Sequence, residues 1–186
     1  MTLARRTAID HYTKLRSDLT EEPRADEIAC GSLASEAGLR FRPITTADLD
    51  DIMVIERTSF SMPWSVNFFR QELQVACSRS VLVESDGRII GYVLFWLLPG
   101  AIDIHNIAVH VDYRRRGVAR MLLDRVVAEA RGRAIFRVLL EVRCSNLAAQ
   151  KLYEAFGFKT TGIRKGYYSD NGEDALAMTL ELAGVS

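Results

Sequence analysis

The stretch "VDYRRRGVARMLLDRVV", residues 111–127, decides the fold, because it joins a strand pattern to a helix pattern. It follows the strand pattern "AIDIHNIAVH", and three arginines then run directly into Gly117. Beyond the glycine, apolar residues recur at helical spacing and share one face: Val118, Met121, Leu122 and Val126. The stretch therefore predicts a strand, a basic turn and an amphipathic helix packed on a core.

The start of this helix is a candidate site for an anion. A helix that begins after Gly117 leaves up to four backbone N–H groups unpaired, and their partial positive charge favours a phosphate. Gly117 and Ala119 keep bulky side chains out of the approach, and Arg115 and Arg116 add donors that suit phosphate geometry. A solvated basic turn before an ordinary helix is the alternative, and this motif alone does not exclude it.

Strand and helix patterns alternate on both sides of this stretch. Helices are expected from a cap at Thr45 or Thr46 through Phe60, from a cap at Ser65 to about Val75, after Gly117, and in "NLAAQKLYEAFG". Strands are expected in "LRFRPI", "SVLVES", "RIIGYVLFWLL", "AIDIHNIAVH", "IFRVLLEVR", "FKTTGIRKGYY" and "EDALAMTLEL", with turns at Asp86-Gly87, Pro99-Gly100 and Asn171-Gly172. The order predicts an α/β fold, with a mixed sheet of about seven strands, partly parallel in its middle, and helices on both faces.

Length and composition indicate one domain. The chain has 186 residues and is 48% hydrophobic, enough for one sizeable core. Residues 1–38 lack a sustained apolar period and are expected to be a mobile N-terminal extension, with the domain proper at 39–186.

Charge, cysteines and hydropathy narrow the possible partners. The 24 basic and 24 acidic residues cancel, which is a poor basis for holding a polyanion, so no direct nucleic-acid contact is expected. Cys30, Cys77 and Cys144 follow no metal-ligand or disulfide spacing, so neither a metal nor a disulfide is expected. The longest apolar run, "IIGYVLFWLL", falls short of the ~20 residues that a bilayer requires. With no signal-peptide pattern at the N-terminus, the expected location is cytoplasmic, away from membranes.

Three motifs that follow one another along the chain indicate a protein family. "RRRGVA" after "NIAV", then "LEVRCSN", then "LYEAFGF" resemble the GCN5-related N-acetyltransferase (GNAT) superfamily, over about Leu39 to Leu182. Within it, "IERTSFSMPWS" and "GYYSDNGEDALAM" look most like the bacterial RimI group, which acetylates the N-terminal alanine of a small-subunit ribosomal protein, and like its archaeal counterparts of broader specificity. The resemblance implies a GNAT fold splayed between strands four and five, acetyl-CoA as cosubstrate, and a protein N-terminus as acceptor.

The resemblance also implies roles for individual residues. Ile107, Ala108 and Val109 would present backbone groups to the pantetheine arm, and Asn146 would meet the same arm. The pyrophosphate would be held by the turn and the first helical residues: Arg114, Arg115, Arg116, Gly117, Val118, Ala119 and Arg120. Glu141 matches the general base of the group, and Tyr153 matches the tyrosine that protonates coenzyme A.

The chemistry of acetyl transfer is consistent with two such residues, because a proton must leave the amine and another must reach the departing thiolate. An N-terminal amine has a pKa near 7.7 to 8.0, against about 10.4 for lysine, so a modest base suffices for an α-amine. Whether Glu141 acts directly or through a water is left open. Without the resemblance, Glu141 paired with Arg143 or another arginine, and Tyr153 as plain packing, are the simpler interpretations.

Other residues and other functions remain as alternatives. His105 is interpreted as a structural residue or a support of the site, and Cys144 as a small buried thiol in preference to a covalent acetyl carrier. Met62-Pro63-Trp64 and Tyr167-Tyr168 are places where an incoming peptide could lie, or else packing at the edge of the core. The alternative functions are acetylation of lysine or a small amine, and a catalytically silent acetyl-CoA-binding module.

Overall fold

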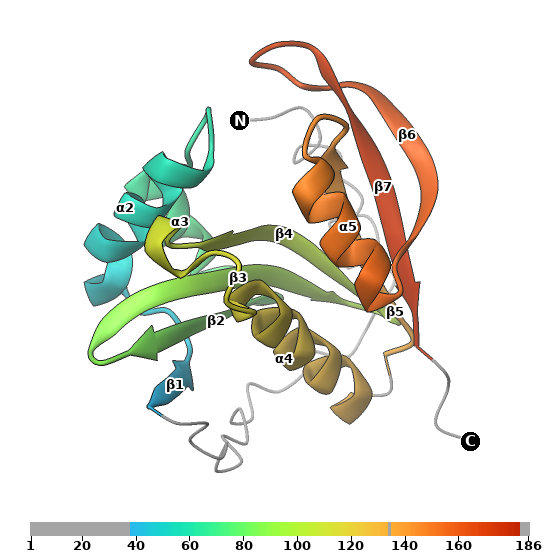
Figure 1. The fold of residues 1–186 in the computed structure, drawn as a ribbon. Helices are drawn as coiled ribbons and strands as arrows, with labels where there is room; N and C mark the ends of the chain where they lie inside the picture. The colour runs from blue at the N-terminus through green and yellow to red at the C-terminus, as the bar shows by residue number, and fades with distance from the viewer. Residues whose placement is uncertain (1–37, 134, 183–186) are drawn as a thin grey trace.

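A computed structural model of the chain describes residues 38–133 and 135–182, and its strands form a single sheet (Figure 1). The seven strands of this part are β1 (Leu39–Arg42), β2 (Ser78–Ser85), β3 (Arg88–Leu98), β4 (Ala101–Val109), β5 (Arg137–Arg143), β6 (Lys159–Tyr168) and β7 (Glu173–Glu181). They lie in the order β1-β2-β3-β4-β5-β7-β6, and only the pair of β4 and β5 among them is parallel. The predicted mixed sheet, parallel in its middle, is confirmed.

The helices of the described residues cover both faces of the sheet. They are α2 (Leu49–Ser59), α3 (Val66–Glu72), α4 (Val118–Gly132) and α5 (Leu147–Phe156), with short 3₁₀ turns η1 (Thr46–Asp48) and η2 (Val111–Tyr113). In Figure 1, α4 and α5 lie in front of the sheet. One buried cluster joins that face to α4 and α5, and a second joins α2 and α3 to the opposite face.

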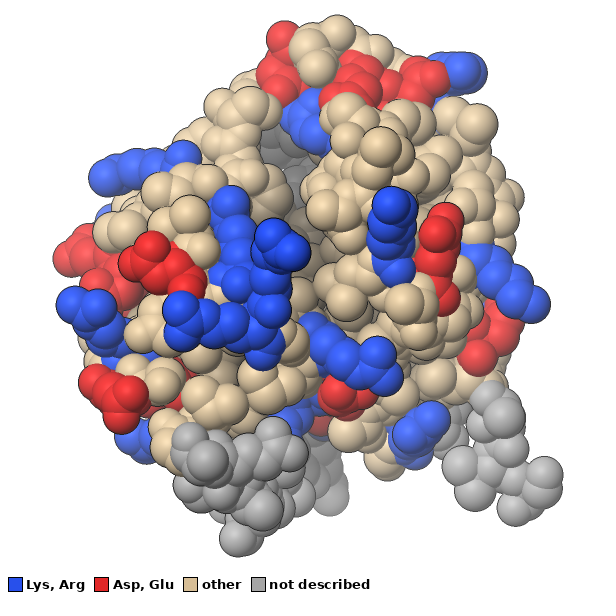
Figure 2. Space-filling model, viewed as in Figure 1, with Lys and Arg blue, Asp and Glu red and all other residues tan. Residues whose placement is uncertain are grey.

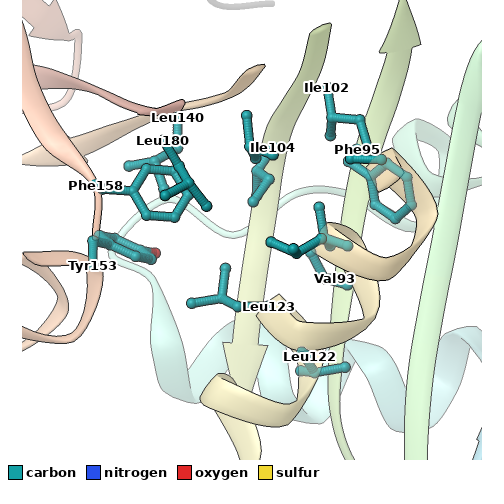
Figure 3. Packing of buried hydrophobic residues seen from close by; sticks show 14 of the residues in the cluster. Val93, Phe95, Ile102, Ile104, Leu122, Leu123, Leu140, Tyr153, Phe158 and Leu180 are labelled. Atoms are coloured by element: carbon teal, nitrogen blue, oxygen red, sulfur yellow. The ribbon is translucent and has the colours of Figure 1, made fainter. Parts of the chain in front are cut away.

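The larger cluster fills the space between the sheet and α4 (Figure 3). Val93 and Ile104 come from the sheet, and Leu122 and Leu123 from the apolar stripe of α4; all four are at most 5% exposed. Tyr153 of α5 reaches the same cluster. Burying such side chains contributes roughly 1.5–3 kcal/mol each to folding, so the apolar period after Gly117 is what attaches α4 to the sheet.

Local signals determine where these elements begin and end. The Ser65 side chain accepts a hydrogen bond from the Phe68 N–H, as a helix cap does, and α3 begins at the next residue. Asp86 and Gly87 both have positive φ angles, 49° and 77°, which is the conformation that a tight Asp-Gly hairpin turn requires. The cap at Ser65 and the hairpin at Asp86-Gly87 are therefore confirmed.

The sheet splits in its middle, where the strands run parallel. β4 and β5 pair only from Ala101 with Arg137 to Ile104 with Leu140, and both strands then continue without pairing to each other. On its other side β4 carries a bulge, since Phe95 pairs with Ile104 while Leu94 pairs with Asn106. A bulge bends its strand and re-aims side chains. The predicted splay between strands four and five is confirmed.

Two expectations concern other parts of the chain. The expected N-terminal extension, residues 1–38, lies outside the described residues except for Gly38. Among the described helices, none is long and apolar enough to cross a membrane.

Candidate active site

A cleft of about 750 Å³ opens where β4 and β5 part. Figure 2 shows the molecule hollowed between α3 and α5, in the same view as Figure 1. Five parts of the chain line the cleft: the end of α2 with the loop that follows it, Phe68 of α3, the middle of β4, the end of β5 with α5, and the end of β6 with the turn after it. We call the loop between α2 and α3 the 60–65 loop.

Glu141 and Tyr153 reach this cleft from opposite faces of the sheet. On β5, Val138, Leu140 and Val142 point into the cluster under α4 and α5, so Glu141 between them points to the other face. Tyr153 comes from α5 and lies in that same cluster. Both side chains nevertheless line one cleft, because the parted strands leave a passage between the two faces. A donor and an acceptor can thus enter from different sides and meet there.

Glu141 is a largely buried carboxylate that pairs with an arginine. Its side chain is 17% exposed, and its Oε1 lies 3.0 Å from Nη2 of Arg164 on β6. Burial raises the pKa of Glu141 above the ordinary glutamate value, while Arg164 and a hydrogen bond from Tyr167 act against that rise. A base of raised pKa is better matched to an amine than an ordinary carboxylate. The pairing with an arginine that we considered is present, and its partner is Arg164.

Asp103 is a second buried carboxyl on the same face of the sheet. It stands on β4 opposite Leu139, two residues before Glu141 on β5, and its side chain is 22% exposed. Burial, and then repulsion from Glu141, raise the pKa of Asp103 to about 7, with Arg164 acting against the rise. Since Arg164 is bonded to Glu141, we assign the retained proton of the pair to Asp103. Sequence reasoning missed Asp103, although its polar side chain within the apolar run "AIDI" was a signal.

Tyr153 is buried, at 6% exposed, and its ring lies 5.7 Å from that of Phe158 (Figure 3). Burial, and then the neighbouring Tyr168, raise the pKa of Tyr153 well above its ordinary value. The phenol therefore keeps its proton at neutral pH and can donate it to a base that forms in the cleft.

A buried glutamate holds one end of the 60–65 loop. Glu56 of α2 is 0% exposed, and its carboxylate accepts hydrogen bonds from the Trp64 N–H at 2.8 Å, from Asn106 Nδ2 at 2.6 Å and from the Tyr92 hydroxyl. Burial raises the pKa of Glu56, and the three donors act against the rise. The network links α2, β3 and β4 to the loop that walls the cleft, and an acidic residue on the apolar face of a helix was the signal for it.

An ion-paired group holds the other end of the loop. Asp170, in the turn between β6 and β7, accepts from Ser61 Oγ at 2.7 Å and from Arg143 Nη2 at 2.7 Å. Arg143 also lies 3.8 Å from the centre of the Tyr168 ring and 3.0 Å from the Glu173 carboxylate. These contacts join the loop to the β6–β7 turn beside the cleft. Arg143 is thereby engaged away from Glu141.

The helix that the sequence predicted after Gly117 is present as α4. Gly117 has φ +83°, a left-handed conformation that favours glycine, and α4 begins at Val118. A β-carbon placed on Gly117 would meet no atom within 4 Å, so the space in front of the turn is open. The Met121 N–H bonds the Gly117 carbonyl, so the N–H groups of the helical residues before it have no partner within α4. Figure 2 shows basic side chains gathered around this end of α4. The turn thus fits a phosphate.

The arginines of the turn are held differently. Arg116 lies over the ring of Tyr113, at 5.3 Å, and Arg120 over the ring of Phe156, at 5.6 Å. The guanidinium of Arg114 instead donates to the Val109 carbonyl and to two oxygens at the end of α2. The sequence placed Arg114 with the phosphate ligands; in this structure its side chain turns to α2.

The remaining predicted residues fall into two groups. Ile107 and Asn146 line the cleft together with Glu141 and Tyr153, whereas Ala108 and Val109 continue along β4 toward the turn. The side-chain oxygen Oδ1 of Asn146 accepts a hydrogen bond from the Ala149 N–H at 3.1 Å and so caps α5. The other lining residues that the sequence singled out are His105, Met62, Pro63, Trp64, Tyr167 and Tyr168. Within the described part of the chain, Cys144 is not among the lining residues.

Comparison with known proteins identifies the family. Residues 49–158 match the sequence profile described as "Acetyltransferase (GNAT) family". The chain belongs to the GNAT family of acetyltransferases. The resemblance drawn from "RRRGVA", "LEVRCSN" and "LYEAFGF" is thereby confirmed, and so is the predicted fold class.

Several relatives within the family belong by name to the RimI group. The "[Ribosomal protein bS18]-alanine N-acetyltransferase" of Salmonella typhimurium is 34% identical over 142 residues, which are 75% of this chain and 95% of that protein. The "N-alpha-acetyltransferase RimI" of Mycobacterium tuberculosis is 34% identical over 141 residues, 73% of this chain and 87% of that protein. The crystal structure of the ribosomal-protein-S18-alanine N-acetyltransferase from Escherichia coli matches with a TM-score of 0.73 and 31% identity, over 80% of this chain and 96% of that one.

Proposed function

We propose that this protein transfers the acetyl group of acetyl-CoA to the N-terminal α-amine of a protein, and that the acceptor is a small-subunit ribosomal protein that begins with alanine. The observation that carries the proposal is the meeting of Glu141 and Tyr153 in one cleft from opposite faces of the sheet. The names of the relatives support the acceptor.

The donor side has the groups that acetyl-CoA needs. Beyond Ile104 the edge of β4 no longer pairs with β5, so backbone groups of residues 107–109 are available to an amide-bearing arm, as at a sheet edge. The open space at Gly117 and the first N–H groups of α4 suit the pyrophosphate, with Arg115, Arg116 and Arg120 nearby.

The acceptor enters on the face that carries Glu141. Acetyl-CoA supplies the thioester, and the neutral amine forms a bond to its carbonyl carbon as the carbon–sulfur bond breaks. Glu141 accepts the proton that the amine loses, directly or through a water, and Tyr153 donates its proton to the departing sulfur. The raised pKa of Glu141 makes it a stronger base than an ordinary carboxylate, and the raised pKa of Tyr153 keeps its phenol protonated until the thiolate forms.

The test is where the acetyl group goes. The purified chain is incubated with acetyl-CoA and a peptide that begins with alanine and carries an internal lysine, and the acetylated atom is located by fragmentation mass spectrometry. We expect acetyl on the α-amine, and none on a matched peptide whose N-terminus is blocked. Acetyl-lysine in both peptides would indicate a lysine acetyltransferase, and product only with small amines would indicate a small-molecule enzyme.

The same assay tests the alternative that the protein is a catalytically silent acetyl-CoA-binding module. Such a protein would bind acetyl-CoA in calorimetry and yield no acetylated product from any acceptor. Glu141→Gln combined with Tyr153→Phe provides the matched control, because it alters the proposed proton transfers and leaves the turn at Gly117 intact. In cells, the fraction of acetylated N-termini among ribosomal proteins, measured with and without the gene, would identify the acceptor.

A further inference from the structure

The side chain of Arg114 connects the turn before α4 to the end of α2. Its Nε donates to the Val109 carbonyl at 3.1 Å, and its Nη2 donates to the Thr58 carbonyl and to Ser59 Oγ, both at 3.0 Å. The three bonds bring together the last residue of β4, the turn and the last turn of α2. The two bonds to α2 join residues that are 56 and 55 positions apart in the chain.

The position of this guanidinium has a clear physical cause. Carbonyls in the last turn of a helix lack an intrahelical partner, and the negative end of the helix dipole attracts a cation. At the end of α2, Arg114 supplies both a hydrogen-bond donor for these carbonyls and a positive charge for the dipole. Its fork-shaped set of donors reaches two neighbouring oxygens at once. A guanidinium held in this way is turned from the N–H groups at the start of α4.

The segment that Arg114 holds leads directly into the 60–65 loop. Ser59 ends α2 and itself lines the cleft. The loop then runs through Ser61, which is bonded to Asp170, to Trp64, which is bonded to Glu56. Arg114 therefore holds the beginning of a loop whose later residues are held by the β6–β7 turn and by the buried glutamate.

We infer that Arg114 is a positioning residue that couples cofactor binding to the acceptor side of the cleft: a pyrophosphate bound to the backbone N–H groups at the start of α4 fixes the turn that carries Arg114, and the bonds of its side chain to α2 then order the 60–65 loop. The inference rests on the proposed function for its identification of donor and acceptor sides. Its physical basis is linkage: if the ordered loop favours the cofactor, the cofactor must favour the ordered loop by the same factor.

The test is hydrogen–deuterium exchange of residues 60–65 with and without saturating coenzyme A. The Trp64 N–H is informative, because it is bonded to the Glu56 carboxylate and exchanges only when the loop opens. In the natural protein we expect coenzyme A to slow this exchange by about fivefold or more, the usual range for coupled sites. Arg114→Gln should abolish the slowing while coenzyme A still binds.

The matched control is Arg116→Gln, which removes the same charge from the same turn but leaves the bonds to α2 in place. It should weaken coenzyme A binding, yet saturating coenzyme A should still slow exchange in the loop. Ser59→Ala removes one acceptor of the Arg114 guanidinium and should reduce the slowing in part. For an acceptor peptide, Arg114→Gln should raise KM several-fold more than it lowers kcat.

Three results would overturn the inference. Slowing that persists in Arg114→Gln, with or without a lower melting temperature, would leave Arg114 a merely structural residue. Loss of detectable coenzyme A binding in Arg114→Gln would make it a phosphate ligand. No slowing in the natural protein would mean that the two sites are not coupled. The exchange experiment uses no acceptor, so its outcome stands even if acetylation of an N-terminal amine is not observed.

Discussion

Replacing Asp103 by asparagine should change how the stability of the protein depends on pH. Asp103 keeps its proton in the folded state up to a pKa of about 7, against 3.8 for an ordinary aspartate, because it is buried beside Glu141. Asparagine has nearly the same shape and does not titrate. The substitution therefore isolates the proton that this carboxyl retains on folding.

The magnitude follows from the two pKa values. A folded-state pKa above the unfolded value means that the folded protein binds the proton more tightly, so the stabilising effect of the proton is full below pH 3.8 and is lost as pH rises through 7. Over the whole range this loss is about 4 kcal/mol. Between pH 5.5 and 8 it is about 2 kcal/mol, equivalent to roughly 4–8 °C in Tm for a domain of this size.

The assay is urea unfolding of the natural protein and of Asp103→Asn, followed by circular dichroism from pH 5.5 to 8. The free energy of unfolding of the natural protein should fall relative to that of the variant by about 2 kcal/mol as pH rises. His105 Nε2 lies 3.7 Å from the Asp103 carboxylate, so the natural protein and the variant are also compared in a His105→Gln background. Glu141, Arg164 and Tyr167 face the same group and are present in both proteins. Parallel pH dependences in both backgrounds would refute the buried, proton-retaining Asp103.

The other predictions concern the proposed catalytic and cofactor groups. Glu141→Gln should lower turnover by roughly 10² to 10⁴ with little change in acetyl-CoA affinity. Raising the pH should partly restore turnover, because more of the α-amine becomes neutral. Near-normal turnover at every pH would remove Glu141 from the mechanism. Tyr153→Phe should lower turnover in a thiol-release assay without rescue at high pH, and an unchanged rate would exclude the tyrosine as acid. Gly117→Val should weaken acetyl-CoA binding about tenfold or more in calorimetry, because a β-branched residue is strained at φ +83° and covers the backbone N–H groups. Unchanged affinity in the folded variant would contradict the phosphate site at this turn.

The elements of the fold were predictable because their signals are local. A helix start after Gly117, an Asp-Gly hairpin at 86–87 and a serine cap at 65 each depend on a few neighbouring residues, and the structure has all three as expected. Glu141 and Tyr153 were predictable for a different reason: they lie in motifs whose order along the chain identifies the family. From spacing alone, Glu141 would have been interpreted as one half of an ion pair and Tyr153 as a packing residue.

What the sequence determined by itself was therefore the order of strands, helices and turns, the family, and which segments border the site. Only the tertiary structure decided which side chains meet there. Arg164, not Arg143, contacts Glu141; Glu56 receives donors from three separate segments; and Arg114 turns to α2. The physical reason is that hydrogen bonds, ion pairs and shifts in pKa depend on distance in space and on burial. Both arise only when residues tens of positions apart in the chain pack around the parted strands.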